Sequence, residues 1–145
     1  LPAIVFLIAG FLSFSTGTAG GPFGILIPIV VPVAQGIDPD LVVVTLSATL
    51  AGSVFGDHCS PISDTTILSS AGAGCSHIEH VSTQLGYACI VAFCCFVGYV
   101  IAGFTKASLA WSLGGAVAAL LVSVFFMHML SMKRQPDAIV QENAN

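Results

Sequence analysis

A short segment in the middle of this chain, residues 56–66, gathers the side chains that could do chemistry. It holds two carboxylates, one histidine, one thiol and four hydroxyls, and long apolar stretches flank it. An ionisable side chain at membrane depth costs about 3 kcal/mol, so such residues usually mark ion or proton pathways. We therefore predict an ion- or proton-binding site. Its candidate residues are Asp57, His58, Ser60, Ser63, Asp64, Thr65 and Thr66.

Asp57 is the first candidate for ion exchange, because it ends the first half of the helix expected here. Neutral oxygens with one carboxylate suit a monovalent hard cation such as sodium. Competition of Na+ and H+ for one carboxylate is then the simplest antiport mechanism. Asp64 has a second reading, as the N-cap of the next helix. His58 also has two readings: it shuttles protons, or it bonds a carbonyl freed by the helix break.

A second polar interruption, residues 15–22, supplies neutral oxygen donors. Its hydroxyls are those of Ser15, Thr16 and Thr18. Three glycines and a proline in the same segment disfavour a helix. The apolar arms on either side, residues 1–14 and 23–34, each reach only about 20 Å at about 1.5 Å per residue. We expect a re-entrant hairpin over residues 1–34. The alternative is one crossing kinked at Gly and Pro.

The composition predicts an integral membrane protein. Of 145 residues, 56% are hydrophobic and 7% are charged, and the mean hydropathy is +1.00, whereas a soluble domain is about one quarter charged. The expected surroundings are therefore a lipid bilayer. Three basic residues exclude nucleic-acid binding, which needs clustered Lys and Arg.

Enzyme chemistry is not indicated by the same residues. Metal-site motifs such as Cys-x-x-Cys and His-Glu-x-x-His are absent from the sequence, and we expect no cofactor. A protease dyad of Asp57 and Asp64 is the best enzyme reading, but Pro61 breaks the helix that would align the two carboxylates. The function expected is transport.

The elements that must position these residues are all helical. A discontinuous helix is expected over residues 41–73, with halves at 41–55 and 65–71 and a stop at Gly56 and Asp57. A polar interfacial loop then covers residues 75–83. Two ordinary spans follow, at residues 84–104 and 106–132.

The end of the chain predicts its orientation. Residues 133–145 are expected to form a disordered tail, and Lys133 and Arg134 at its start place it in the cytoplasm by the positive-inside rule. The inner (plasma) membrane is the expected location. Counting back along the spans, the hairpin of residues 1–34 would enter from the outside.

The order of residues in the broken helix also carries a resemblance. Residues 56–75, which begin Gly-Asp-His-Cys-Ser-Pro-Ile-Ser-Asp-Thr-Thr, closely resemble the signature of the NhaC-type sodium/proton antiporter family. Residues 14–29 and 77–85 are also similar to that family. One departure lies at residues 19–21, which read Ala-Gly-Gly where family members usually carry a tryptophan and a threonine or serine.

The resemblance implies an architecture from the ion transporter superfamily, with inverted repeats that each contain a re-entrant hairpin and a broken helix. Residues 1–132 would then be the C-terminal transmembrane domain, and the N-terminal half of the same protein would be its partner. On that reading the chain is a fragment, inactive alone; a truncated, non-transporting gene product is another reading. The oligomeric state stays open, a homodimer included.

The same resemblance implies the transported solutes. Sodium and protons are the first expectation. The alternative is Na+- or H+-coupled exchange of small organic anions or amino acids, of the malate and lactate kind, whose carboxylates the N-termini of half-helices could hold.

Overall fold

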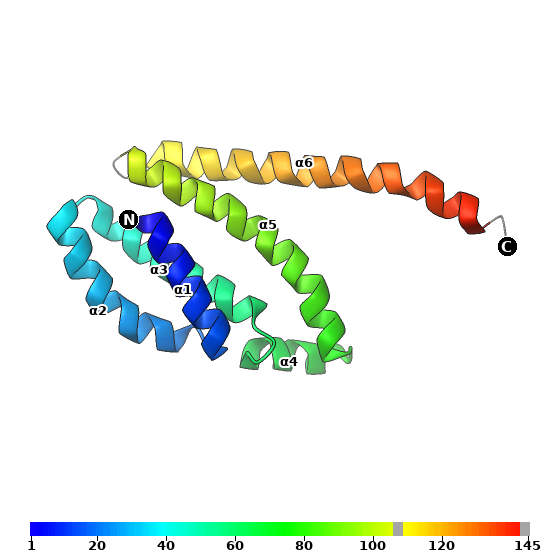
Figure 1. Ribbon diagram of the computed structural model, residues 1–145, viewed down its shortest axis with the longest axis horizontal. Coiled ribbons are helices and arrows are strands. Elements are labelled where there is room, and N and C mark those ends of the chain that lie inside the picture. Colours follow the sequence, from blue (N-terminus) through cyan, green and yellow to red (C-terminus); the bar gives the residue numbers. More distant parts are fainter. Residues whose placement is uncertain (106–108, 143–145) are drawn as a thin grey trace.

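The computed structural model describes residues 1–105 and 109–142, with only the backbone described for residues 109 and 130–142. Over these residues every regular element is a helix (Figure 1), which confirms the all-α class. The helices are α1 (Pro2–Thr16), α2 (Gly20–Ile37), α3 (Leu41–Cys59), α4 (Asp64–Ala73), α5 (His77–Phe104) and α6 (Leu109–Glu142).

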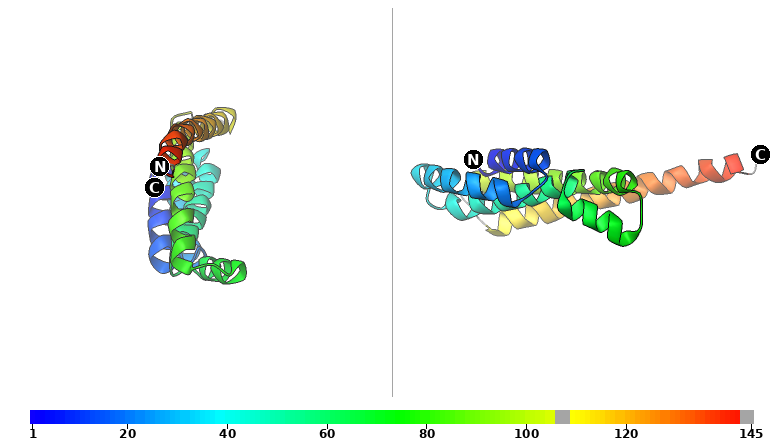
Figure 2. Two further views of the ribbon diagram at one scale, coloured as in Figure 1. Left: turned by 90° about the vertical axis from the view of Figure 1, so that its right-hand side faces the viewer. Right: turned by 90° about the horizontal axis from the view of Figure 1, so that it is seen from below.

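The pair α1 and α3 forms the centre of the molecule. Helices α2 and α5 each contact both α1 and α3, whereas α6 contacts only α5 among the described residues. The start of α1, the turn between α2 and α3 and the end of α5 lie at one end of this layer (Figure 1). The α1–α2 turn and the α3–α4 break lie at the opposite end, where α4 projects sideways from the layer (Figure 2).

Four helices are long and apolar enough to cross a membrane. They are α2, α3, α5 and the segment Ala110–Met129 of α6, while α1 is apolar but shorter. Helix α2 has 18 residues, more than the arm expected over residues 23–34. An 18-residue helix is near the lower length limit for crossing a membrane by itself. This length fits both a crossing helix and an arm of a hairpin, so the re-entrant hairpin stays a prediction.

The interruption between α1 and α2 is shorter than predicted. Only residues 17–19 separate the two helices, so the prediction of a non-helical segment over residues 15–22 was wrong. Pro22 lies in the first turn of α2, where a missing N–H costs nothing because no intrahelical acceptor awaits it. Gly17 ends α1 in the left-handed region, with φ 67°.

The break in the discontinuous helix lies later than predicted. Helix α3 continues through Gly56 and Asp57 to Cys59. Ser60 is extended, with φ −75° and ψ 127°, because Pro61 disfavours the helical conformation of the residue before it. The break is therefore residues 60–63, which we call the break loop, and Asp57 lies in the last turn of α3.

Two further boundaries differ from the sequence prediction. Helix α5 begins at His77, inside the expected loop of residues 75–83. Ser76 and Glu79 have the S-x-x-E order found at helix starts, although the Ser76 side chain forms no cap hydrogen bond. Helix α6 continues to Glu142, where a disordered tail was expected from residue 133. Lys133, Arg134 and Gln135 are good helix formers, but Pro136 disfavours a helix interior, so the sequence alone does not explain this continuation. Residues 106–108 and 143–145 lie outside the described residues.

Small residues bring α1 and α3 into backbone contact. A Cβ atom on Gly52 would collide with the carbonyl of Phe6, and one on Gly56 would collide with the carbonyl of Gly10. Their spacing is that of the G-x-x-x-G contacts of membrane helices. The face of α3 that they belong to is buried and consists of Thr45, Ala48, Thr49, Gly52, Ser53 and Gly56. Asp57 extends this face toward the break loop.

Candidate functional site

Asp57 is the centre of the candidate site. Its side chain is 8% exposed. The Ser63 hydroxyl donates to Oδ1 at 2.7 Å, and the Thr65 hydroxyl donates to Oδ2 at 3.3 Å. The two hydroxyl oxygens are themselves 2.7 Å apart. The chain after the break thus folds back so that its hydroxyls face the carboxylate at the end of α3.

Three more hydroxyls near this carboxylate along the chain are buried. Ser53 lies one turn before Asp57, Ser60 in the break loop, and Thr66 in the first turn of α4. None of them has a hydrogen-bond partner among the described residues. A buried hydroxyl without a partner costs about 1–3 kcal/mol, and a bound water or ion is one reason for such a group in a native protein. Their oxygens are therefore free to act as ligands.

The α1–α2 turn lies against the break loop. A Cβ atom on Gly17 would lie 2.9 Å from the carbonyl oxygen of Ile62. The Ser13 hydroxyl is hydrogen-bonded to the carbonyl of Thr18 at 2.9 Å and also to the carbonyl of Ser53. Two interruptions far apart in the sequence therefore meet at one end of the molecule, with Asp57 beside them.

The hydroxyls predicted from the first interruption do not join Asp57. Ser15, Thr16 and Thr18 are all exposed. The Ser15 and Thr16 hydroxyls each donate at 2.9 Å to carbonyls of their own helix, those of Phe11 and Leu12. In this structure a backbone carbonyl of the turn, that of Thr18, accepts a hydrogen bond from Ser13 of α1.

Asp64 lies apart from this cluster. It is exposed and is the first residue of α4, while Ser63 occupies the N-cap position. Its carboxylate forms no hydrogen bond with a described residue. The alternative role of Asp64 as an N-cap is therefore not observed, and the Ser63 side chain is directed to Asp57 instead of capping α4.

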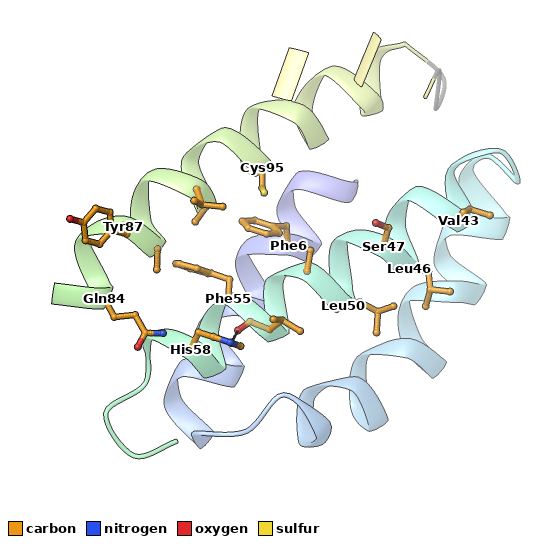
Figure 3. Close-up of a pocket in the computed structure, with 15 residues that line it drawn as sticks. Phe6, Val43, Leu46, Ser47, Leu50, Phe55, His58, Gln84, Tyr87 and Cys95 are labelled. Carbon is orange, nitrogen blue, oxygen red and sulfur yellow. Dashed lines mark hydrogen bonds between the residues drawn. The ribbon is translucent and has the colours of Figure 1, made fainter. Parts of the chain in front are cut away.

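His58 faces another part of the molecule. It lines a mostly apolar groove of about 880 Å³ between α3 and α5, near Gln84 and Tyr87 (Figure 3). Its Nδ1 is 2.9 Å from the carbonyl of Val54, one turn earlier in α3. Consecutive helix residues do not face the same way, so His58 and Asp57 do not share one cluster.

Sequence reasoning missed three residues at this end of the molecule: Ser13, Ser53 and His77. A signal for Ser53 was present, because Thr45, Thr49, Ser53 and Asp57 recur every fourth residue and so share one helix face. His77 Nε2 lies 2.7 Å from the carbonyl of Pro61. No local pattern reveals that contact, because it joins α5 to the break loop.

The fold and the site together define a class. Four apolar helices of spanning length and a buried carboxylate at a helix break characterise a multi-pass membrane protein that carries polar groups in its interior. The chain belongs to the Na+/H+ antiporter family, whose sequence profile matches residues 1–104. The match covers α1 to α5 and confirms the family resemblance of the broken helix.

Two of the following three similar proteins are named as antiporters. An uncharacterized protein of Haemophilus influenzae is 50% identical over 122 residues, which is 84% of this chain and 24% of the relative. An uncharacterized Na+/H+ antiporter of the same organism is 40% identical over 88 residues, 58% of this chain and 19% of the relative. A malate-2H+/Na+-lactate antiporter of Bacillus subtilis is 28% identical over 148 residues, 92% of this chain and 31% of the relative.

The chain therefore spans between 19% and 31% of the length of these relatives. No solved structure matches the chain.

Proposed function

We propose that this chain forms part of a secondary active transporter that exchanges sodium for protons, with Asp57 as the shared binding group. One observation carries the proposal: a buried carboxylate at a helix break, bonded to two hydroxyls, beside buried hydroxyls that have no partner among the described residues. Family membership supports the same function.

The geometry suggests how one carboxylate serves both ions. The Ser63 and Thr65 hydroxyls donate to Asp57 when its carboxylate is charged. When such a hydroxyl rotates, its oxygen lone pairs face the space beside the carboxylate instead of its hydrogen. Neutral oxygens together with one carboxylate suit a sodium ion. Asp57 also lies at the C-terminal end of α3, where the helix dipole favours a cation. A proton on the carboxylate removes the charge that sodium needs.

We also propose that the site is completed by the N-terminal half of a longer transporter. The relatives are several times longer than this chain, and inverted-repeat transporters bind their ions between two broken helices. On this proposal the transporter lies in the inner membrane with its C-terminus in the cytoplasm. The chain by itself would bind but not transport.

The test is Asp57→Asn in the full-length transporter, reconstituted in vesicles with a pH-sensitive dye. Asparagine keeps the shape but has no titratable group, so sodium-driven proton movement should fall to background. Asp40→Asn is the matched control, because Asp40 is exposed in the α2–α3 turn at the opposite end and should leave the rate unchanged. Normal exchange in the Asp57 variant would disprove the role of Asp57.

A second candidate function is exchange of a small organic anion. The observation that favours it is the malate-2H+/Na+-lactate antiporter among the relatives, together with the N-terminus of α4 at the break loop, since a helix N-terminus attracts a carboxylate. Saturable binding of labelled malate or lactate to the full-length protein, with no proton movement driven by sodium alone, would establish it in place of Na+/H+ exchange.

A further inference from the structure

His77 is the first residue of α5 and reaches across to two other elements. Its Nε2 lies 2.7 Å from the carbonyl oxygen of Pro61 in the break loop. Its Nδ1 lies 3.2 Å from the hydroxyl of Ser70, near the end of α4. One side chain thus connects the break loop, α4 and α5 at the end of the molecule where Asp57 lies.

The carbonyl of Pro61 has no helical donor. Within a break, carbonyls lose these donors, and each is satisfied by another protein group or by water. The neighbouring carbonyls of Ser60 and Ser63 accept backbone N–H groups, from Ser63 at 3.3 Å and Ile67 at 3.0 Å. The carbonyl of Pro61 accepts a hydrogen bond from the imidazole of His77 instead. His58, one of whose expected roles was a bond to a freed carbonyl, lies against the carbonyl of Val54 within α3 instead.

Hydrogen-bond directions fix part of the ring's arrangement. A carbonyl only accepts, so Nε2 carries a hydrogen and donates it to Pro61. The Ser70 hydroxyl is also 2.9 Å from the carbonyl of Ile67, and Ser70 is 4% exposed. The ring is thus attached at both nitrogens, and its attachment on the α4 side is itself buried.

We propose that His77 is a positioning residue for the ion site: it holds the carbonyl of Pro61 and thereby fixes the break loop that carries Ser60 and Ser63. This inference rests on the proposed function, because it concerns the same site. The bond from Ser63 to Asp57 is 2.7 Å long and depends on where the break loop lies. Releasing Pro61 from α5 lets Ser60 and Ser63 move relative to the carboxylate.

The first experiment compares three variants by hydrogen–deuterium exchange of the segment 57–66 in the purified full-length protein. In His77→Ala the segment should exchange about tenfold faster than in the unmodified protein, on the scale of one lost hydrogen bond. His77→Gln keeps an N–H donor and should restore most of the protection. His80→Gln is the control, because His80 lies three residues further along α5 and its side chain bonds no described residue; it should change nothing.

The second experiment measures sodium dependence in vesicles. A positioning role predicts that His77→Ala raises the sodium concentration for half-maximal exchange about tenfold and changes the maximal rate less. His77→Gln should return the half-maximal sodium concentration most of the way to that of the unmodified protein. The proposal is overturned if His77→Ala leaves the deuterium exchange of segment 57–66 unchanged. It is also overturned if His80→Gln speeds that deuterium exchange as much as His77→Ala does. If the unmodified protein moves no protons with sodium, Na+/H+ antiport fails, while deuterium exchange still decides the role of His77.

Discussion

The carboxylate of Asp57 is bonded by residues from beyond the helix break, not from its own helix. Ser63 and Thr65 follow it by six and eight residues, and the break loop is what turns the chain back toward α3. A continuous helix would place both hydroxyls about two turns further along. The break thus converts a linear sequence of polar residues into a cluster, and on the proposed function the strength of ion binding would depend on these two hydroxyls.

A prediction at this scale concerns Ser63. Ser63→Ala removes a hydrogen bond to a charged group, worth about 1.5–3 kcal/mol, so the sodium concentration for half-maximal exchange should rise at least about tenfold. Titration of exchange rate against sodium in vesicles measures it. Ser69→Ala is the matched control, because Ser69 is exposed and donates to the carbonyl of Thr65 in its own helix. Equal shifts of the half-maximal sodium concentration in the two variants would contradict a role of Ser63 in sodium binding.

Residue types made Asp57 predictable, but its partners needed the fold. Residues 56–66 contain Ser63 and Thr65, and the sequence placed both in the cluster without separating them from Asp64 and His58. Which of them face the carboxylate depends on where the helix ends. Contacts that join distant residues, such as Ser13 with the carbonyl of Ser53, leave no mark on local sequence.

At the scale of elements, the contact between the α1–α2 turn and the break loop gives a prediction. Gly17 and Gly74 both have positive φ, 67° and 65°, but only Gly17 is packed, against Ile62. Alanine in this conformation costs about 1–2 kcal/mol at either position. Gly17→Ala should therefore lower the thermal unfolding midpoint in detergent more than Gly74→Ala, since it also displaces Ile62.

The two glycine variants should differ in function as well. Only Gly17→Ala is expected to raise the sodium concentration for half-maximal exchange, because the added methyl group displaces the break loop that carries Ser60 and Ser63. Gly74→Ala should lose stability alone, with the sodium dependence of the unmodified protein. Identical behaviour of the two variants in both measurements would show that the two interruptions do not act together.

Helix boundaries were predictable only where a local signal dominates. Pro61 marks a break, and the sequence predicted one here, but Gly56 was read as its start. The structure shows that Gly56 serves close packing against Gly10, which no single-chain pattern separates from a helix stop. The start of α5 was missed for a related reason: the polar residues 75–83 were read as loop, whereas His77 and Glu79 lie in a helix.

At the scale of the whole molecule, the prediction concerns orientation. Lys133 and Arg134 follow the last apolar span, so a C-terminal fluorescent protein should fold in the cytoplasm and a C-terminal alkaline phosphatase should be inactive. Fusions placed after Phe104, at the end of α5, should behave in the opposite way. The reversed pattern would place the C-terminus outside.

The class of the molecule was predictable as a whole because composition alone excludes a soluble domain. The family was predictable because a long ordered segment, residues 56–75, carries its resemblance, and the family match over residues 1–104 confirms it. Arrangement in space was not predictable. The position of α5 across α1 and α3 and the groove that His58 faces both depend on packing between helices far apart in the chain.

The glycine contacts between α1 and α3 have a mechanical consequence. Where main-chain atoms of two helices touch, as at Gly52 and Gly56, no side chains lie between them that could change rotamer and let one helix slide along the other. Helices α1 and α3, with the turn and the break loop at their ends, should therefore move as one rigid body. Any motion that opens the carboxylate first to one side of the membrane and then to the other has to occur at the remaining boundaries of this pair.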